Sequence, residues 1–155
     1  MVPDILLVSD SEAVRDEVKA AVEDSSTTFR ELTRGSAVRP AVQERTPDLA
    51  IIDLQVGKMG GMATCLDLRL EESADRLPHV PVLMLLDRRA DVFLARRSEA
   101  EGWLVKPLDP MRLGRAVRTV LGGGTYEDGA YRPVTVVPRG TETPFGHGAA
   151  SGPVQ

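Results

Sequence analysis

The segment LAIIDLQVGKMGG, residues 49–61, combines an apolar run, an acid and a glycine-rich turn. The run Leu49–Ile52 has the length of a strand, and an uninterrupted apolar run is typical of a strand buried on both faces. Asp53 follows at its carboxyl end, which is where open parallel sheets place their ligand-binding groups. We therefore take Asp53 as a candidate functional carboxylate, with an ordinary surface acid as the alternative.

A short apolar run followed by an amphipathic helix recurs along the chain. The expected strands are Ile5–Val8, Thr28–Thr33, Leu49–Ile52, Val82–Leu86 and Trp103–Val105. Five such β-α units predict an α/β fold with a doubly wound, parallel, five-stranded sheet and helices on both faces. Residues that follow four of these strands should then meet at one rim of the sheet, namely Ser9-Asp10, Asp53, Leu86-Asp87 and Lys106-Pro107.

Composition limits the class of protein. The chain has 155 residues, 42% of them hydrophobic, and a formal net charge of −4, so its overall charge does not favour nucleic acid or membrane surfaces. Its single cysteine, Cys65, excludes an internal disulfide, and His79 and His147 stand apart from other metal ligands in the sequence. No apolar run approaches the roughly 20 residues of a membrane span, and the N-terminus lacks a basic signal-peptide region. We expect a cytoplasmic protein that does not span the membrane.

The last part of the chain has a different composition. Residues 122–155 contain eight Gly and four Pro, which is typical of an extended tail. We therefore expect the globular domain to span residues 1–121. The stretch YRPVTVVP, residues 131–138, has enough strand character to add to a sheet edge. We expect this tail to dock on a partner through Tyr131, Val134 and Val136, with a free coil as the alternative.

Four landmarks make residues 4–121 resemble the receiver domain of two-component response regulators: ILLVSD (5–10), IIDL (51–54), MGGM (59–62) and WLVKPLDP (103–110). The resemblance implies a flavodoxin-like receiver fold. It implies that Asp53 accepts a phosphoryl group from a histidine kinase and that Lys106 contacts this group. It also implies a Mg²⁺ site at Asp10, Asp53 and Gln55.

The chain departs from the family pattern at the predicted metal and phosphoryl positions. Ser9 replaces the first of two acids, which weakens the expected Mg²⁺ site. Leu86 replaces a threonine or serine, so a hydrogen bond to the phosphoryl group is lost, and such bonds to charged groups contribute about 1.5–3 kcal/mol. Lys106 is then free to bridge Asp53 permanently.

Two further positions differ from the pattern. Asp87 stands where the family prefers a small residue, and we expect its side chain to turn outward and pair with Arg88 or Arg89. Trp103 occupies the position of an aromatic switch residue. Without the threonine partner we expect it to be a fixed packing or docking residue.

Basic residues concentrate near the fourth and fifth helices. Residues 88–118 hold eight basic and four acidic side chains. In the family, the face formed by the fourth helix, fifth strand and fifth helix docks protein partners, and the arginines expected on it are Arg88, Arg89, Arg96, Arg97, Arg112, Arg115 and Arg118. A solvated helix surface is the alternative.

Three functions remain open from the sequence. The first is a stand-alone atypical receiver, not an enzyme, that acts as a protein-interaction or accessory module; the resemblance implies respiratory complex I as a possible partner and hence an indirect membrane association. The second is a phosphorylatable regulator that receives a phosphoryl group at Asp53. The third, a nucleic-acid-associated factor, is least expected because no DNA-reading motif follows the fifth helix.

Overall fold

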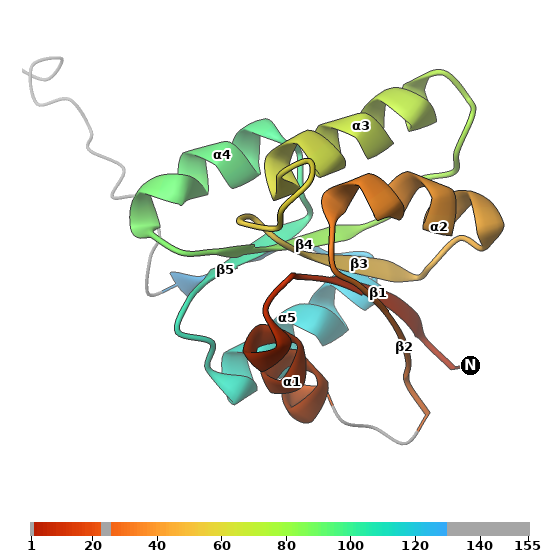
Figure 1. The fold of residues 1–155 in the computed structure, drawn as a ribbon. Helices are drawn as coiled ribbons and strands as arrows, with labels where there is room; N and C mark the ends of the chain where they lie inside the picture. Colours follow the sequence, from red (N-terminus) through yellow and green to blue (C-terminus); the bar gives the residue numbers. More distant parts are fainter. Residues whose placement is uncertain (1, 23–25, 130–155) are drawn as a thin grey trace, which may run out of the picture.

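A computed structural model describes residues 2–22 and 26–129, and its elements alternate between strands and helices as predicted (Figure 1). The strands are β1 (Asp4–Val8), β2 (Thr28–Leu32), β3 (Leu49–Asp53), β4 (Val82–Leu86), β5 (Gly102–Val105) and β6 (Tyr126–Glu127). The helices are α1 (Glu12–Ala21), α2 (Val38–Glu44), α3 (Gly61–Ser73), α4 (Val92–Arg97) and α5 (Pro110–Leu121). Short 3₁₀ turns, Gly35–Ala37 and Arg89–Asp91, precede α2 and α4.

The strands form one parallel sheet in the order β2-β1-β3-β4-β5-β6. Helices α1 and α5 cover one face and α2, α3 and α4 cover the other, so the doubly wound α/β fold is confirmed (Figure 1). The strand order reverses between β1 and β3, and the loops at this switch point form the predicted rim.

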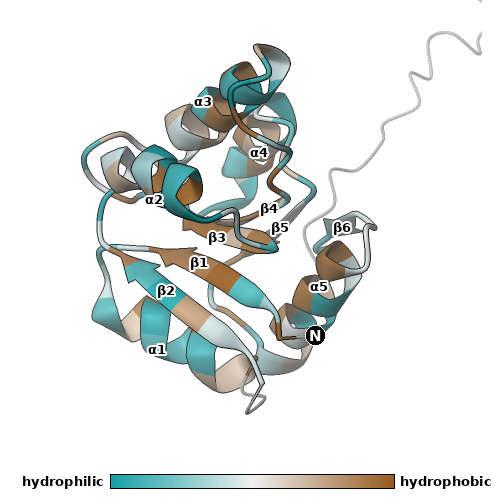
Figure 2. Cartoon of the chain, turned by 90° about the vertical axis from the view of Figure 1, so that its right-hand side faces the viewer, coloured by the Kyte–Doolittle hydropathy of each residue, from teal (hydrophilic) through white to brown (hydrophobic). Residues whose placement is uncertain are grey.

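The core explains why the central strands are so apolar. All five residues of β3 and of β4 are buried, because each strand contacts helices on both faces. Along β4 the side chains alternate, with Met84 and Leu86 packing on the α2, α3 and α4 side and Leu83 and Leu85 packing on the α1 and α5 side. Figure 2 shows β1 and β3 as the hydrophobic centre and β2 as a mixed outer strand.

The helix starts follow from local chemistry. Ser11 caps α1 by accepting a hydrogen bond from the Val14 amide, and Asp109 caps α5 by accepting one from the Arg112 amide. Helix α3 has no side-chain cap. It begins at Gly61, where a Cβ atom would lie 2.7 Å from the Asp53 carbonyl oxygen, so only glycine lets α3 start this close to the end of β3.

The sheet has one strand more than predicted. After α5, the chain turns through Gly122–Gly124 and pairs Tyr126 and Glu127 with Gly102 and Trp103 of β5. Strand β6 was not predicted, because two paired residues carry no periodic signal. The described structure thus continues past the predicted boundary at residue 121. Tyr131, Val134 and Val136 lie outside the described residues, so the docking of the tail stays a prediction.

Candidate functional site

The carboxylate of Asp53 is the centre of the rim. Its residue is 2% exposed at the end of β3. The Ser9 hydroxyl donates to Oδ2 at 2.8 Å, and the Lys106 ammonium lies 2.9 Å from Oδ1. The main-chain N–H of Gln55 donates to Oδ1 at 3.1 Å. The structure therefore confirms that the ends of β1, β3 and β5 bring these groups together, and Asp53 is not an ordinary surface acid.

The two residues after β1 have different roles. Ser9 is fully buried, and its uncharged hydroxyl donates a hydrogen bond to Asp53. Ser9 stands where a second acidic side chain was expected from the family pattern. Its carbonyl accepts a hydrogen bond of 2.7 Å from Arg15, which fixes the start of the loop. Asp10 is exposed and accepts a hydrogen bond from the Gly57 amide at 3.3 Å. Of the two residues after β1, Asp10 is thus the one that presents a carboxylate to solvent.

The position of Asp87 differs from the prediction that it pairs with Arg88 or Arg89. Its carboxylate does not pair with Arg88 but lies 2.9 Å from the Lys106 ammonium, while Arg88 pairs with Asp91 at 3.0 Å. The ends of β4 and β5 are neighbours in the sheet, and the side chain of Lys106 is only 21% exposed, so a second carboxylate stabilises its charge. Lys106 is therefore shared between two acids at the rim.

These contacts change the pKa of Lys106. Burial alone would lower the pKa, but hydrogen bonds to Asp87 and Asp53 and the attraction of both carboxylates outweigh it, so the pKa is raised. The positive charge of Lys106 is consequently retained throughout the physiological pH range.

Lys106→Met is expected to lower the free energy of unfolding by about 2 kcal/mol near neutral pH, because hydrogen bonds to two charged groups are lost. Since the folded pKa is raised, this stabilisation is complete below the ordinary lysine pKa of about 10.4 and is lost as pH rises through the higher folded value. Urea unfolding from neutral pH to about pH 11 measures the difference. A difference that does not shrink at high pH contradicts the prediction, and Lys58→Met, at an exposed lysine, is the control.

Leu86 and Trp103 belong to the hydrophobic core. Leu86 is fully buried among residues of the α2, α3 and α4 side, and its side chain has no hydrogen-bond donor to offer the rim. Trp103 is 3% exposed in the same cluster, and its indole nitrogen is buried without a hydrogen-bond partner. Of the two roles predicted for Trp103, packing or docking, this conformation shows packing, because almost none of its surface is exposed.

The arginines of the predicted basic face do not form one continuous surface. Arg96 pairs with Glu127 at 2.9 Å, and Arg112 pairs with Asp128 at 2.8 Å. Arg118 lies on the other side of α5, in a hollow that it shares with Ala21 of α1. The remaining arginines of the set are all exposed, and they are Arg88, Arg89, Arg97 and Arg115. These neutralising acids were not predicted, because they follow a glycine turn that was assigned to the tail.

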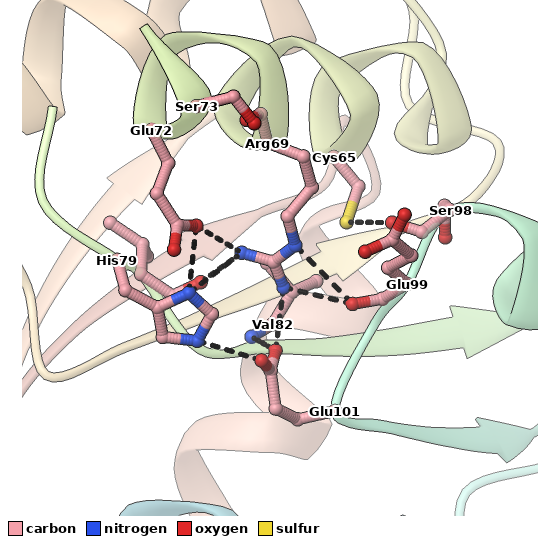
Figure 3. Close-up of polar contacts among 10 residues, drawn as sticks. Cys65, Arg69, Glu72, Ser73, His79, Val82, Ser98, Glu99 and Glu101 are labelled. Carbon is pink, nitrogen blue, oxygen red and sulfur yellow. Dashed lines mark hydrogen bonds and ion pairs between the residues drawn. The ribbon is translucent and has the colours of Figure 1, made fainter. Parts of the chain in front are cut away.

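A second polar cluster lies near the amino ends of β4 and β5, away from the rim (Figure 3). The Arg69 guanidinium donates to the carbonyls of Val80 and Glu99 and to the carboxylate of Glu101. It therefore ties α3 to the loops that precede β4 and β5, and we assign it a structural role.

His79 is part of this cluster, so its expected isolation is wrong. Its Nδ1 lies 2.8 Å from Glu72 and its Nε2 lies 2.7 Å from Glu101 (Figure 3). The two carboxylates contact opposite ring nitrogens and cannot share one ion with the imidazole. Within residues 2–22 and 26–129, no group of three acidic, histidine or cysteine side chains is arranged to hold a metal.

The rim itself supplies a smaller set of metal donors. Asp10 and Asp53 offer carboxylate oxygens, and the main chain of Gln55 contacts Asp53. Mg²⁺ is often held by one or two carboxylates together with water, and the acids at the rim outnumber the single lysine. The donor set therefore fits a weak Mg²⁺ site.

Comparison with known proteins agrees with this geometry. The family model described as the response regulator receiver domain matches residues 5–118. The chain belongs to this family. Among structures, this receiver resembles the chemotaxis response regulator CheY4 of Vibrio cholerae, with a TM-score of 0.68 and 24% identity over 77% of this chain and 99% of the other. The receiver domain of NtrX from Brucella abortus gives a TM-score of 0.67 at 23% identity over 77% and 98%.

Curated relatives are longer than this receiver. The transcriptional regulatory protein CseB of Streptomyces coelicolor is 28% identical over 81% of this chain and 55% of its own length. The DNA-binding dual master transcriptional regulator RpaA of Synechocystis is 31% identical over 77% and 49%. The chain thus spans about half the length of the curated relatives it matches. Among the described residues, no helix is both long and apolar enough to cross a membrane.

Proposed function

We propose that this receiver accepts a phosphoryl group on Asp53 and acts as a phosphorylation-dependent regulator in a two-component system. The observation that supports the proposal most directly is the nearly buried Asp53 carboxylate with the Lys106 ammonium 2.9 Å away. The family match and the response regulators among its relatives favour the same function.

The chemistry needs a nucleophile and compensation for negative charge. A carboxylate oxygen of Asp53 forms a bond to phosphorus while the P–N bond of a phosphohistidine in the kinase breaks. The leaving histidine nitrogen keeps the electron pair and takes up a proton. Lys106 offsets charge on the phosphoryl oxygens, and the Ser9 hydroxyl orients the carboxylate through Oδ2. In this proposal the chain receives the group and is not an enzyme with its own substrate.

A divalent ion would assist at the same rim. Asp10, Asp53 and the main chain of Gln55 would hold Mg²⁺, which supplies neutralisation of the phosphoryl oxygens when bound. Because Ser9 contributes no charge, we propose that this receiver binds Mg²⁺ more weakly than a receiver with two acids after β1.

Leu86 changes how the phosphorylated state would be stabilised. A leucine donates no hydrogen bond to the phosphoryl group, and its side chain packs against the core instead. We propose that phosphorylation here lacks the contact that would draw the end of β4 toward Asp53. The signal then has to reach a partner through Lys106 and its second acid, Asp87.

Phosphorylation is tested by incubating the full chain with Mg²⁺ and excess acetyl phosphate or phosphoramidate and measuring its intact mass. We expect the mass of one added phosphoryl group in the wild type and none in Asp53→Asn, which has nearly the same size but no carboxylate. Absence of the adduct in the folded wild type, with a receiver of known activity as positive control, would overturn the proposal.

A second candidate is a phosphorylation-independent interaction module. It is favoured by the contacts of Lys106 with both Asp53 and Asp87, which lock the charges of the rim in one arrangement. Affinity purification from the native cell tests it, because this function requires that wild type and Asp53→Asn retain the same partner equally well. A histidine kinase among the partners supports the first candidate. Recovery with respiratory complex I would support the accessory role and the membrane association, which stay predictions.

A further inference from the structure

The acid that follows β6 is fully buried, although it is close in sequence to the last described residue, Gly129. Asp128 has no exposed surface. Its Oδ2 accepts a hydrogen bond from the Val105 amide at 3.2 Å, and its Oδ1 accepts one from the Arg112 guanidinium at 2.8 Å. A buried carboxylate with such partners is costly to leave unpaired, so these contacts hold the end of β6 firmly between β5 and α5.

The position of Val105 connects this contact to the rim. Val105 is the last residue of β5, and Lys106 follows it directly. On the other side of the strand, the Lys106 amide donates to the Leu86 carbonyl of β4 at 2.8 Å. The main chain that carries Lys106 is therefore held from both sides, by β4 through Leu86 and by the chain after β6 through Asp128.

We propose that Asp128 is a positioning residue for Lys106, so that β6 and the acid after it are coupled to the phosphoryl-accepting rim. In a longer sixth strand, a main-chain carbonyl would accept the hydrogen bond of the Val105 amide. Here β6 ends at Glu127, and the side chain of Asp128 accepts this hydrogen bond instead. Loss of this acceptor leaves the Val105 amide unpaired and lets the end of β5 move. The ammonium of Lys106 then no longer stays within hydrogen-bond distance of Asp53.

The coupling acts in both directions. A group that binds the rim through Lys106 stabilises the end of β5 and, through Val105, the contact with Asp128. A change that releases Asp128 weakens binding at the rim by the same factor. A partner that moves β6 would therefore change the acceptor site without touching it.

Three variants separate positioning from general stability. Asp128→Ala removes both contacts, Asp128→Asn keeps an oxygen for the Val105 amide, and Glu127→Gln alters the neighbouring acid, whose side chain is 37% exposed. The first readout is the NMR signal of the Lys106 ammonium, which is visible when hydrogen bonds slow its proton exchange. We expect the signal to be lost in Asp128→Ala and kept in Asp128→Asn and Glu127→Gln. Its persistence in folded Asp128→Ala would overturn the proposal.

The second readout is the rate of phosphorylation by phosphoramidate, which rests on the proposed function. We expect it to fall on the order of tenfold or more in Asp128→Ala, because small displacements of a catalytic group are costly, and to change little in the other two variants. If the wild type takes no phosphoryl group, the proposed function fails while the ammonium signal still tests the positioning role.

A measurement on the wild type covers the case in which Asp128→Ala does not fold. Amide hydrogen exchange is compared with and without Mg²⁺ and beryllofluoride, a mimic of the phosphoryl group. We expect slower exchange at Val105 and at residues 126–128 when the mimic is bound. Unchanged exchange at these amides, with protection confined to the loops around Asp53, would contradict the coupling.

Discussion

Gly35→Ala is expected to lower the free energy of unfolding by about 3 kcal/mol or more, at the upper end of the range for overpacked sites. A Cβ atom at Gly35 would lie 1.9 Å from the carbonyl oxygen of Met59 and 2.4 Å from the hydroxyl of Thr64. The nearest contact is with main chain, which cannot rotate away as a side chain can. The loop after Asp53 would therefore have to move.

The loop after Asp53 is held by hydrogen bonds from the Gly35 segment, which the substitution would disturb. Lys58 and Met59 have φ angles of 53° and 83°, a left-handed conformation that costs non-glycine residues about 1–2 kcal/mol each. Hydrogen bonds from the amides of Gly35 and Ser36 to the carbonyls of Gly57 and Lys58 stabilise it. We therefore expect Gly35→Ala also to slow phosphorylation at Asp53.

Thermal or urea unfolding measures the stability change, and the mass assay with a phosphodonor measures the effect on the site. Gly60→Ala is the matched control in the same loop, because a Cβ atom there would have its nearest contact at 3.7 Å, an ordinary van der Waals distance. Equal stability of the two variants would contradict the steric argument.

Arg69→Met is expected to lower the free energy of unfolding by about 3 kcal/mol, because it keeps the aliphatic stem and removes a largely buried guanidinium that donates to two carbonyls and to the Glu101 carboxylate. The Arg69 side chain is 11% exposed, and its loss leaves the carbonyl of Val80 without this donor. The carbonyl of Glu99 loses the same donor (Figure 3). Glu101 also loses its nearest cation and keeps the Val82 amide as a donor.

Arg45→Met is the control for the loss of stability in Arg69→Met, because it removes an arginine from an exposed ion pair. Arg45 is 59% exposed in its ion pair with Asp4, and exposed pairs contribute about 0–1 kcal/mol. Urea unfolding of both variants compares the loss of the largely buried Arg69 guanidinium with the loss of an exposed ion pair. Because the cluster lies away from the rim, Arg69→Met should leave phosphorylation of the folded fraction unchanged. A slower reaction of the folded protein would show that the cluster acts on the site.

Much of the fold followed from local patterns. The runs at β1, β3, β4 and β5 are apolar because both faces of the sheet are covered, so the positions of these strands along the chain could be predicted to within one residue at each end. The start of α5 was equally clear, since Asp109-Pro110 combines a cap with a first-turn proline. The rim followed from these assignments, because strand ends in a parallel sheet converge.

Other features depended on partners far away in the sequence. Asp87 was expected to pair with one of its neighbours, Arg88 or Arg89, but the structure places the Lys106 ammonium, from the end of the adjacent strand, 2.9 Å from its carboxylate. Asp128 lies after a glycine turn, and nothing in its local sequence indicates that it would be fully buried. Gly35 likewise gives no local sign that the loop after β3 will pack against it.

The sequence by itself therefore determined the α/β fold of alternating strands and helices, the place of Asp53 at a strand end and the absence of a hydroxyl at Leu86, because hydrophobic periodicity and residue identity are local properties of the chain. The receiver assignment followed from the resemblance of its motifs to that family. Only the tertiary structure decided the sharing of Lys106 between Asp53 and Asp87, the burial of Asp128 against Val105 and the division of the arginine face. The physical reason is that ion pairs and close contacts depend on distances across the sheet, which sequence separation does not record.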